Sequence, residues 1–168
     1  QDCMPKVRSY VNSILNDQNI KTVIIGLTWY VDDLIDSNGK KINDYNYSAR
    51  IEAMNKLILS LNKKGKKVYL LGPIETPQKE FASILSRKIA FQNIQNYNLS
   101  VPKENFISKY QIPLEYFSKN LGKNFLLPHK ILCDSQNCNF ADKQGSYFSD
   151  TNHLSFYGSL KMKPLFNF

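Results

Sequence analysis

Residues 22–27 read Thr22-Val23-Ile24-Ile25-Gly26-Leu27, a continuous apolar run rich in β-branched side chains. Such a run is typical of a strand that is buried on both faces of a parallel sheet. A second short run, Lys67-Val68-Tyr69-Leu70-Leu71, ends at Gly72-Pro73. Between the two runs, residues 47–62 repeat apolar side chains with the helical period. Strand, helix and strand in this order predict a βαβ unit of an open parallel sheet.

The rest of the chain continues the alternation of helices and strands. Helices are expected over residues 5–17, 78–93, 113–120 and 155–165. A turn is expected at Ser37-Asn38-Gly39, a third strand at Phe125-Leu126-Leu127, and a stapled loop with a short strand pair over residues 131–148. The predicted fold is α/β, a three-layer αβα domain with a mainly parallel sheet. Such sheets place reactive groups at the carboxyl ends of their strands, here the loop after Leu27 and the loop before the last helix.

Length and composition fit one domain with a packed core. The chain has 168 residues, of which 42% are hydrophobic. No apolar run approaches the roughly 18–20 residues that a membrane-spanning helix needs, so we expect none. The opening Gln1-Asp2-Cys3 has no Met, no basic start and no apolar stretch, which indicates a processed or partial chain rather than a secretory signal.

The formal charge of +8 comes from 22 Lys and Arg against 14 Asp and Glu. Only three of the 22 are arginines and the lysines are scattered, whereas nucleic-acid surfaces concentrate Arg and Lys on one face. The densest cluster, residues 63–67, lies where a helix is expected to end, and Gly65 is a natural cap there. No nucleic-acid partner is expected, and the excess charge suits a position near an anionic envelope surface.

The cysteines are informative through their spacing. Cys133 and Cys138 enclose four polar residues, a short loop that a disulfide could staple. A zinc site would need two further ligands, and neither His129 nor His153 comes with a matching second cysteine pair, so no metal is expected. A disulfide implies an oxidising compartment, the periplasm or the cell exterior. Cys3 is then either free or paired with a partner outside these residues.

The most specific stretch runs from Ser149 to Gly158, with the sequence Ser-Asp-Thr-Asn-His-Leu-Ser-Phe-Tyr-Gly. Asp150 and His153 are three residues apart in a turn before the last helix, a spacing that brings two side chains together. A carboxylate in this position can accept the Nδ1–H of the imidazole and leave Nε2 to act as a base. The alternative is an aspartate that caps the helix beside an exposed histidine.

This stretch, Asp150 to Leu154 followed by Gly158, resembles the last sequence block of the SGNH/GDSL hydrolase superfamily. From Cys3 to Gly158, the order of features is similar to that of the SGNH domain fused behind acyltransferase-three membrane proteins. Those domains share five features with this chain: a cysteine before a helix (Cys3), an apolar strand ending near a tryptophan (Trp29), a strand running into Gly-Pro (Gly72-Pro73), a short-spaced cysteine pair (Cys133, Cys138) and an aromatic-x-Asp-x-x-His-Leu block (148–154).

The resemblance implies an SGNH/flavodoxin-like fold and serine-dependent acyl transfer. A serine attacks an ester or thioester carbonyl, His153 takes and returns the proton, and Asp150 orients the ring. The implied role is O-acylation, most simply O-acetylation, of an envelope glycan such as lipopolysaccharide O-antigen or peptidoglycan. The implied partners are a membrane acyltransferase domain that supplies the acyl group and the glycan acceptor, without a cofactor. The implied location is the periplasmic or extracellular face of the bacterial inner membrane.

Two alternative functions remain open. A carbohydrate esterase or lipase of the same superfamily would transfer the acyl group to water. A non-catalytic glycan-binding module would follow if the nucleophilic serine and the oxyanion asparagine have been lost.

Two features of the resembled family do not occur in these 168 residues. There is no Gly-Asp-Ser, the block that carries the nucleophile, so we expect an N-terminal part with the first strand and the serine to lie outside this chain. In place of the Gly-x-Asn-Asp block, which supplies an oxyanion asparagine, the chain has Leu27-Thr28-Trp29-Tyr30. Trp29 is expected either to stack on the acceptor sugar or to cover the core, and Thr28 to contact the substrate.

Four other polar sites receive structural interpretations. Ser155 is expected to cap the last helix rather than act as the nucleophile. Asp32-Asp33 is interpreted as a solvated pair rather than a metal or acid pair, and His129, which follows Pro128, as a structural residue. Glu75 lies either at the rim of the site or in a plain loop.

Overall fold

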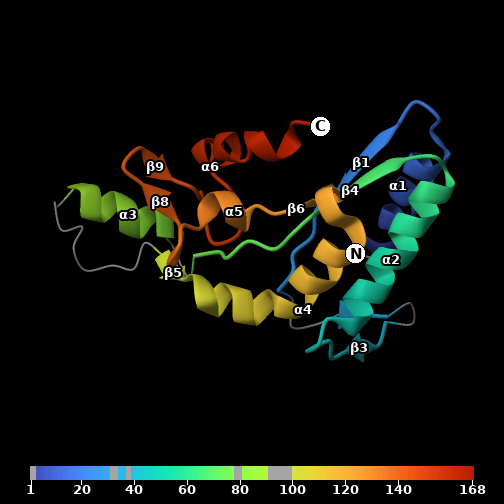
Figure 1. The fold of residues 1–168 in the computed structure, drawn as a ribbon, viewed down its shortest axis with the longest axis horizontal. Coiled ribbons are helices and arrows are strands. Elements are labelled where there is room, and N and C mark those ends of the chain that lie inside the picture. Colours follow the sequence, from blue (N-terminus) through green and yellow to red (C-terminus); the bar gives the residue numbers. More distant parts are fainter. Residues whose placement is uncertain (1–2, 31–33, 37–38, 78–80, 91–99) are drawn as a thin grey trace. The chain divides into compact units, whose positions relative to one another are not determined.

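The computed structural model describes residues 3–30, 34–36, 39–77, 81–90 and 100–168 (Figure 1). The chain divides into two compact units: unit 1 comprises Gln1–Leu71 and Glu115–Phe125, and unit 2 comprises Gly72–Leu114 and Leu126–Phe168. The single domain expected from the length stays a prediction. The Asp32-Asp33 pair and residues 37–38 of the expected turn lie outside the described residues.

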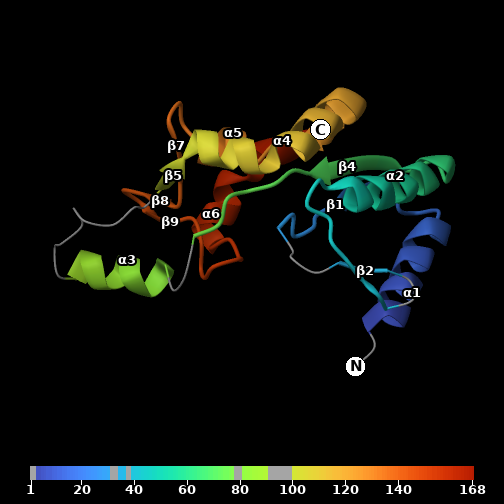
Figure 2. The same ribbon diagram turned by 90° about the horizontal axis from the view of Figure 1, so that it is seen from below.

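Unit 1 contains the predicted βαβ unit. Its elements are α1 (Cys3–Asn16), β1 (Thr22–Ile25), β2 (Leu34–Ile35), β3 (Lys41–Ile42), α2 (Ser48–Lys63), β4 (Lys67–Leu71), the last part of α4 (Lys103–Leu121) and η2 (Gly122–Asn124). Strands β1 and β4 pair in parallel, from Thr22 opposite Lys67 to Ile25 opposite Leu70. The connection between them contains α2, which runs along β4 (Figure 2). The predicted order of strand, helix and strand is therefore confirmed.

The parallel sheet has the strand order β1-β4-β6, where β6 is Phe125–Leu126. The α/β class with a parallel sheet is thereby confirmed. The central strand β4 is buried over its three middle residues, whereas β1 has one neighbour among the described strands and its Ile24 is 44% exposed. The prediction that residues 22–27 are buried on both faces is therefore wrong, because β1 lies at the edge of the described sheet. An apolar hollow of about 230 Å³ lies beside it, lined by residues of α1, β1 and α2.

The lysine-rich turn between α2 and β4 does more than end a helix. Helix α2 ends at Lys63 and Gly65 adopts φ 71°, which confirms the predicted glycine cap. Lys66 is buried, and its Nζ donates to the backbone carbonyls of Asp17 and Ile20 at 2.7 and 3.0 Å. One lysine of the cluster therefore ties this turn to the turn before β1 instead of facing solvent.

Unit 2 is built around short antiparallel pairs. Its elements are α3 (Phe81–Ala90), β5 (Ser100–Pro102), the first part of α4, α5 (His129–Leu132), β7 (Asn137–Asn139), β8 (Ala141–Asp142), β9 (Gly145–Ser146), α6 (Phe156–Lys161) and η3 (Lys163–Phe166). Strand β5 pairs with β7 and β8 with β9. The core consists of Phe81, Leu85, Leu132, Phe140, Tyr147, Phe148 and Met162. The short strand pair expected over residues 131–148 is confirmed as β8–β9.

Three expected helices differ in extent. Helix α3 covers residues 81–90, and the remainder of the expected 78–93 lies outside the described residues. Helix α4 begins at Lys103 rather than at Pro113, with a break at Tyr110. Proline is favoured at the first position of a helix, which suggested a start there, but here it follows a kink inside a longer helix. The last helix ends at Lys161 and is followed by the 3₁₀ turn η3.

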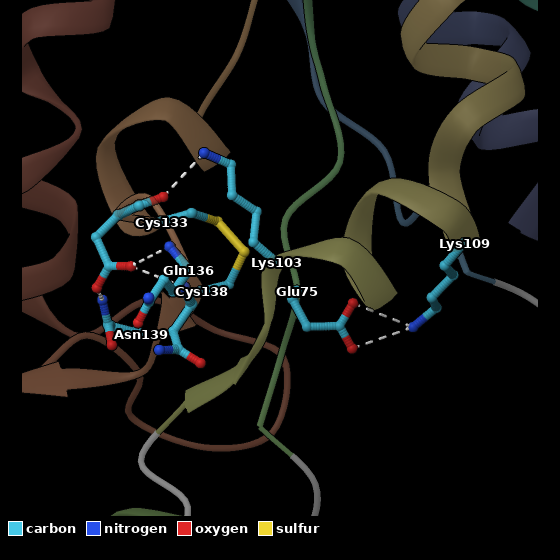
Figure 3. Close-up of a disulfide and its surroundings, with 9 residues drawn as sticks. Glu75, Lys103, Lys109, Cys133, Gln136, Cys138 and Asn139 are labelled. Atoms are coloured by element: carbon cyan, nitrogen blue, oxygen red, sulfur yellow. Dashed lines mark hydrogen bonds and ion pairs between the residues drawn. A yellow bond between two sulfur atoms is a disulfide. The ribbon is translucent and has the colours of Figure 1, made fainter.

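The predicted stapled loop joins α5 to β7 (Figure 3). Cys133 and Cys138 form a disulfide, as expected from their spacing. Within the loop, Asp134 Oδ1 accepts the backbone N–H groups of Gln136 and Asn137 at 2.8 and 2.7 Å. A hydrogen bond from the Asn139 amide, followed by the two backbone N–H groups, lowers the pKa of Asp134 to about 2. The carboxylate therefore stays charged and holds the loop together from inside.

His129 is the core residue that the sequence predicted. It is 7% exposed, its ring centroid lies 5.1 Å from that of Phe106, and its Nδ1 has no hydrogen-bond partner among the described residues. Burial, and then the charges of Lys130 and Lys103, lowers the pKa of His129 to about 4. The ring is therefore neutral in the folded protein near pH 7.

We predict that His129 makes the fold sensitive to acid. In the unfolded chain a histidine titrates near pH 6.5, so between pH 6.5 and 4 the unfolded state binds more protons and the free energy of unfolding falls as the pH is lowered. The slope is at most about 1.4 kcal/mol per pH unit. Urea unfolding measures this. Between pH 7.5 and pH 5, the free energy of unfolding should fall less for His129→Phe than for the wild type. Equal losses in both proteins would contradict the assignment.

We also predict that the disulfide stabilises the chain. Replacing both Cys133 and Cys138 by Ser should lower the free energy of unfolding by about 2 kcal/mol. Without the covalent loop, the unfolded chain has more conformational entropy and is therefore favoured. Urea unfolding with and without dithiothreitol measures this. The reductant should destabilise the wild type and leave the double variant unchanged; a wild type that is insensitive to it would contradict the prediction.

Candidate active site

The Asp-x-x-His sequence lies in a closed loop between β9 and α6 (Figure 1). Phe148 and Leu154 form an antiparallel bridge at its base, and the Ser149 N–H donates to the His153 carbonyl at 2.9 Å. The next residue, Ser155, donates its N–H to the Tyr147 carbonyl, also at 2.9 Å. Backbone hydrogen bonds therefore join the two ends of the loop to each other.

Asp150 organises this loop with both carboxylate oxygens. Oδ1 accepts the backbone N–H groups of Asn152 and His153, each at 2.7 Å, and Oδ2 lies 2.7 Å from His153 Nδ1. The Asn152 N–H, followed by the His153 ring and the His153 N–H, lowers the pKa of Asp150 to about 2. The contact between the two side chains that the sequence predicted is present, and the carboxylate is ionised at neutral pH.

This contact selects one tautomer of the imidazole. A carboxylate at Nδ1 favours the proton on that nitrogen and leaves the Nε2 lone pair on the far side of the ring. The His153 side chain is 78% exposed and that of Asp150 54% exposed, so the ring is accessible rather than buried. The pair can therefore accept a proton at Nε2 and stabilise the resulting imidazolium.

The competing interpretation, an aspartate that caps the last helix, does not hold. The N-cap of α6 is Ser155, whose Oγ accepts the Gly158 N–H at 3.0 Å and donates to the Ser146 carbonyl at 2.6 Å. The predicted capping role of Ser155 is thus confirmed. Its hydroxyl is engaged on both sides, so it is not a candidate nucleophile.

Helix α6 approaches the backbone of Tyr147 closely. A Cβ at position 158 would lie 2.0 Å from the Tyr147 carbonyl oxygen, a distance that no side chain can occupy. Glycine at this position is what allows the first turn of α6 to lie against the strand that leads into the loop.

The sequence model of the family described as "SGNH domain (fused to AT3 domains)" matches residues 1–168. The chain belongs to this SGNH family. Its fold is similar to the structure of the Salmonella ser. Paratyphi A lipopolysaccharide acetyltransferase periplasmic domain, with a TM-score of 0.62 and 21% sequence identity. The match covers 94% of this chain and 59% of that chain, so the SGNH domain spans less than two thirds of its structural neighbour. No curated protein matches the chain.

In this SGNH domain, Trp29 is a core residue of unit 1. It is 4% exposed, its Nε1 donates to the Leu71 carbonyl at 3.0 Å, and its ring meets Phe117 and Phe125 edge to face. Of the two interpretations of Trp29, covering the core and stacking on a sugar, the burial favours the first. Thr28 beside it is exposed.

The structure brings together Asp150 and His153, which both belong to unit 2, whereas Thr28 and Trp29 belong to unit 1. The substrate-binding role of the latter two stays a prediction.

In unit 2, Glu75 forms an ion pair with Lys109 of α4 at 3.3 Å, as Figure 3 shows.

Among the described residues there is no group of three or more His, Cys, Asp or Glu side chains that could hold a metal ion. Over the same parts of the chain, no helix is long and apolar enough to cross a membrane.

Sequence reasoning missed the polar side chains that hold α6 in place. Asp142 of β8 is contacted by Tyr157, near the start of this helix, and by Lys161, at its end. The spacing of Tyr157 and Lys161, four residues apart on one helical face, is the signal that could have indicated a shared partner.

We predict that Gly158→Ala is strongly destabilising because the added methyl group meets a backbone carbonyl that cannot rotate away. A loss of about 2 kcal/mol or more in the free energy of unfolding is expected. Gly26→Ala is the matched control, since a Cβ there makes an ordinary contact of 3.9 Å with Leu71. Urea unfolding of both variants measures the difference; equal stability would show that α6 can move aside at no cost.

Proposed function

We propose that this SGNH domain transfers an acyl group, most simply acetyl, to a hydroxyl of an envelope glycan on the extracytoplasmic side of the membrane. The single observation that carries the proposal is the 2.7 Å contact between Asp150 and His153 in a solvent-accessible loop. Membership of a family fused to AT3 domains supports it, and so does the fold shared with a lipopolysaccharide acetyltransferase periplasmic domain. The disulfide suits an oxidising compartment.

In the proposed reaction, His153 Nε2 removes the proton from a serine hydroxyl as the oxygen attacks the carbonyl of the acyl donor. These 168 residues contain no Gly-Asp-Ser, so we assign the serine to a part of the protein outside them. The imidazolium is stabilised by the ionised Asp150 and returns its proton to the departing group. A glycan hydroxyl then attacks the acyl-serine carbonyl while His153 accepts its proton. The bond from the acyl group to the serine oxygen breaks, and His153 returns the proton to that oxygen, which regenerates the serine.

The proposed partner is a membrane AT3 domain of the same polypeptide that presents the acyl donor. The family description names that fusion, and the glycan is the acceptor. The chemistry needs a nucleophile, a base and donors for the oxyanion, so we assign no metal or diffusible cofactor to it.

Ester hydrolysis is the second candidate function. The observation that favours it is the 78% exposure of the His153 side chain, since a base that is open to solvent can activate water as readily as a sugar hydroxyl. Counting free acetate against acetylated glycan separates the two activities. We assign transfer because the structural neighbour is an acetyltransferase domain.

We predict that His153→Ala in the full polypeptide lowers acyl transfer at least about 100-fold, which is the contribution expected of a general base. Asp150→Asn should cause a comparable loss. Its amide oxygen can still accept the two backbone N–H groups, but its NH₂ cannot accept the Nδ1 proton, so the wrong tautomer is favoured.

The measurement is turnover of 4-nitrophenyl acetate together with glycan acetylation in the cell envelope. Lys119→Ala, an exposed position of α4, is the control and should retain full activity. A folded His153→Ala protein with wild-type turnover would refute the proposed function.

A further inference from the structure

A polar cluster outside the Asp150–His153 pair lies where α6 meets the β8–β9 hairpin. Asp142, at the end of β8, accepts hydrogen bonds from two residues of α6: the Tyr157 hydroxyl at 2.7 Å and Lys161 Nζ at 2.8 Å. The Tyr147 hydroxyl is a third donor at 3.2 Å, all three to Oδ2. We call Asp142, Tyr157 and Lys161 the α6 clamp.

The aromatic rings around the clamp reinforce it. Lys161 Nζ lies 4.9 Å from the ring centroid of Tyr147 and 5.2 Å from that of Tyr157, within the range of cation–π attraction. The Tyr157 ring also lies against the hairpin, since a Cβ on Gly145 would lie 3.4 Å from its Cδ1. The cation therefore lies beside one carboxylate and two aromatic rings, and its side chain stays about one third exposed.

The charges of the clamp support one another. Burial by itself would raise the pKa of Asp142, but the hydrogen bonds from Lys161 and Tyr157 hold it well below its usual range. The hydrogen bond with Asp142 in turn raises the pKa of Lys161. Both groups are therefore ionised over the whole physiological range of pH.

The clamp holds one end of the loop that carries His153. The other end, Phe148, is buried in the core of unit 2. After Leu154 the chain passes directly through Ser155 into α6, so the position of α6 sets where the far end of the loop lies. Because the exposed His153 ring has little packing of its own, its direction depends on Asp150 and on these two ends.

We propose that the α6 clamp is a positioning device for His153: by fixing α6 on the β8–β9 hairpin, it sets the direction in which Nε2 faces. It touches no reacting atom. The inference rests on the proposed function, and it adds Asp142, Tyr157 and Lys161 to that function as positioning residues. Reacting groups have to be held closely, and a displacement of about 1 Å can lower a rate about 100-fold.

A purely stabilising role predicts a different pattern of effects. The side chains of Asp142 and Lys161 are about one third exposed, and ion pairs of this kind contribute little to the free energy of unfolding. The hydrophobic side of α6 and η3 is held separately, through Met162 in the core. Loss of the clamp should therefore change the rate far more than the stability.

The test uses Tyr157→Phe and Lys161→Met in the full polypeptide, with Lys161→Arg as the conservative variant. We expect kcat for 4-nitrophenyl acetate to fall about 10-fold in the first two, with KM and the thermal midpoint nearly unchanged, and Lys161→Arg to restore most of the rate. Lys56→Met, which removes the exposed Glu52–Lys56 pair of α2, is the matched control and should leave kcat unchanged.

Each other outcome overturns the inference. Unchanged kcat in Tyr157→Phe and Lys161→Met, with His153→Ala inactive, removes the positioning role and leaves the proposed function standing. A loss of kcat that disappears at a lower temperature, where the variants are fully folded, assigns the clamp to stability alone. An active His153→Ala protein refutes the proposed function itself, and the positioning role fails with it.

Discussion

The close approach of α6 to the backbone of Tyr147 is the constraint on which the candidate site depends. Glycine at position 158 permits it, and the Ser155 hydroxyl links the start of the helix to the carbonyl of Ser146. Because the helix begins directly after the loop, this one contact determines where the loop can close. The bridge between Phe148 and Leu154 and the hydrogen bonds beside it then follow from backbone geometry, since the ends of the loop are brought within reach of each other.

Asp150 has two tasks in that loop, and the two tasks use different oxygens. Oδ1 shapes the backbone by accepting two N–H groups, and Oδ2 holds the imidazole of His153. The hydrogen bonds that shape the loop also keep the carboxylate charged, and the charge is what an imidazolium needs as a partner. Local structure and proposed chemistry therefore come from the same side chain. The proposed role of the α6 clamp is to set the direction in which His153 Nε2 faces.

Features that leave a pattern of spacing or periodicity in the sequence were predicted well. The parallel pairing of β1 with β4, the glycine cap after α2, the disulfide and the contact of Asp150 with His153 all follow from spacing or periodicity. Features that leave no such pattern were not predicted. The exposure of β1 depends on which strands lie beside it. An apolar run has the same sequence pattern at the edge of a sheet as at its centre. The buried Lys66 and the meeting of Asp142 with Lys161 likewise join residues that only the fold brings together.

The burial of Lys66 changes what the net charge of +8 means for encounters with anions. Its ammonium group still contributes to the field that draws a negatively charged surface over a distance of about one Debye length. Its hydrogen atoms, however, are directed at two backbone carbonyls and are not available to a phosphate. The cations of Arg50 and Lys161 are similarly engaged, with Asp44 and Asp142. These three cations therefore contribute to the long-range attraction of anions, whereas their own donors are engaged within the fold.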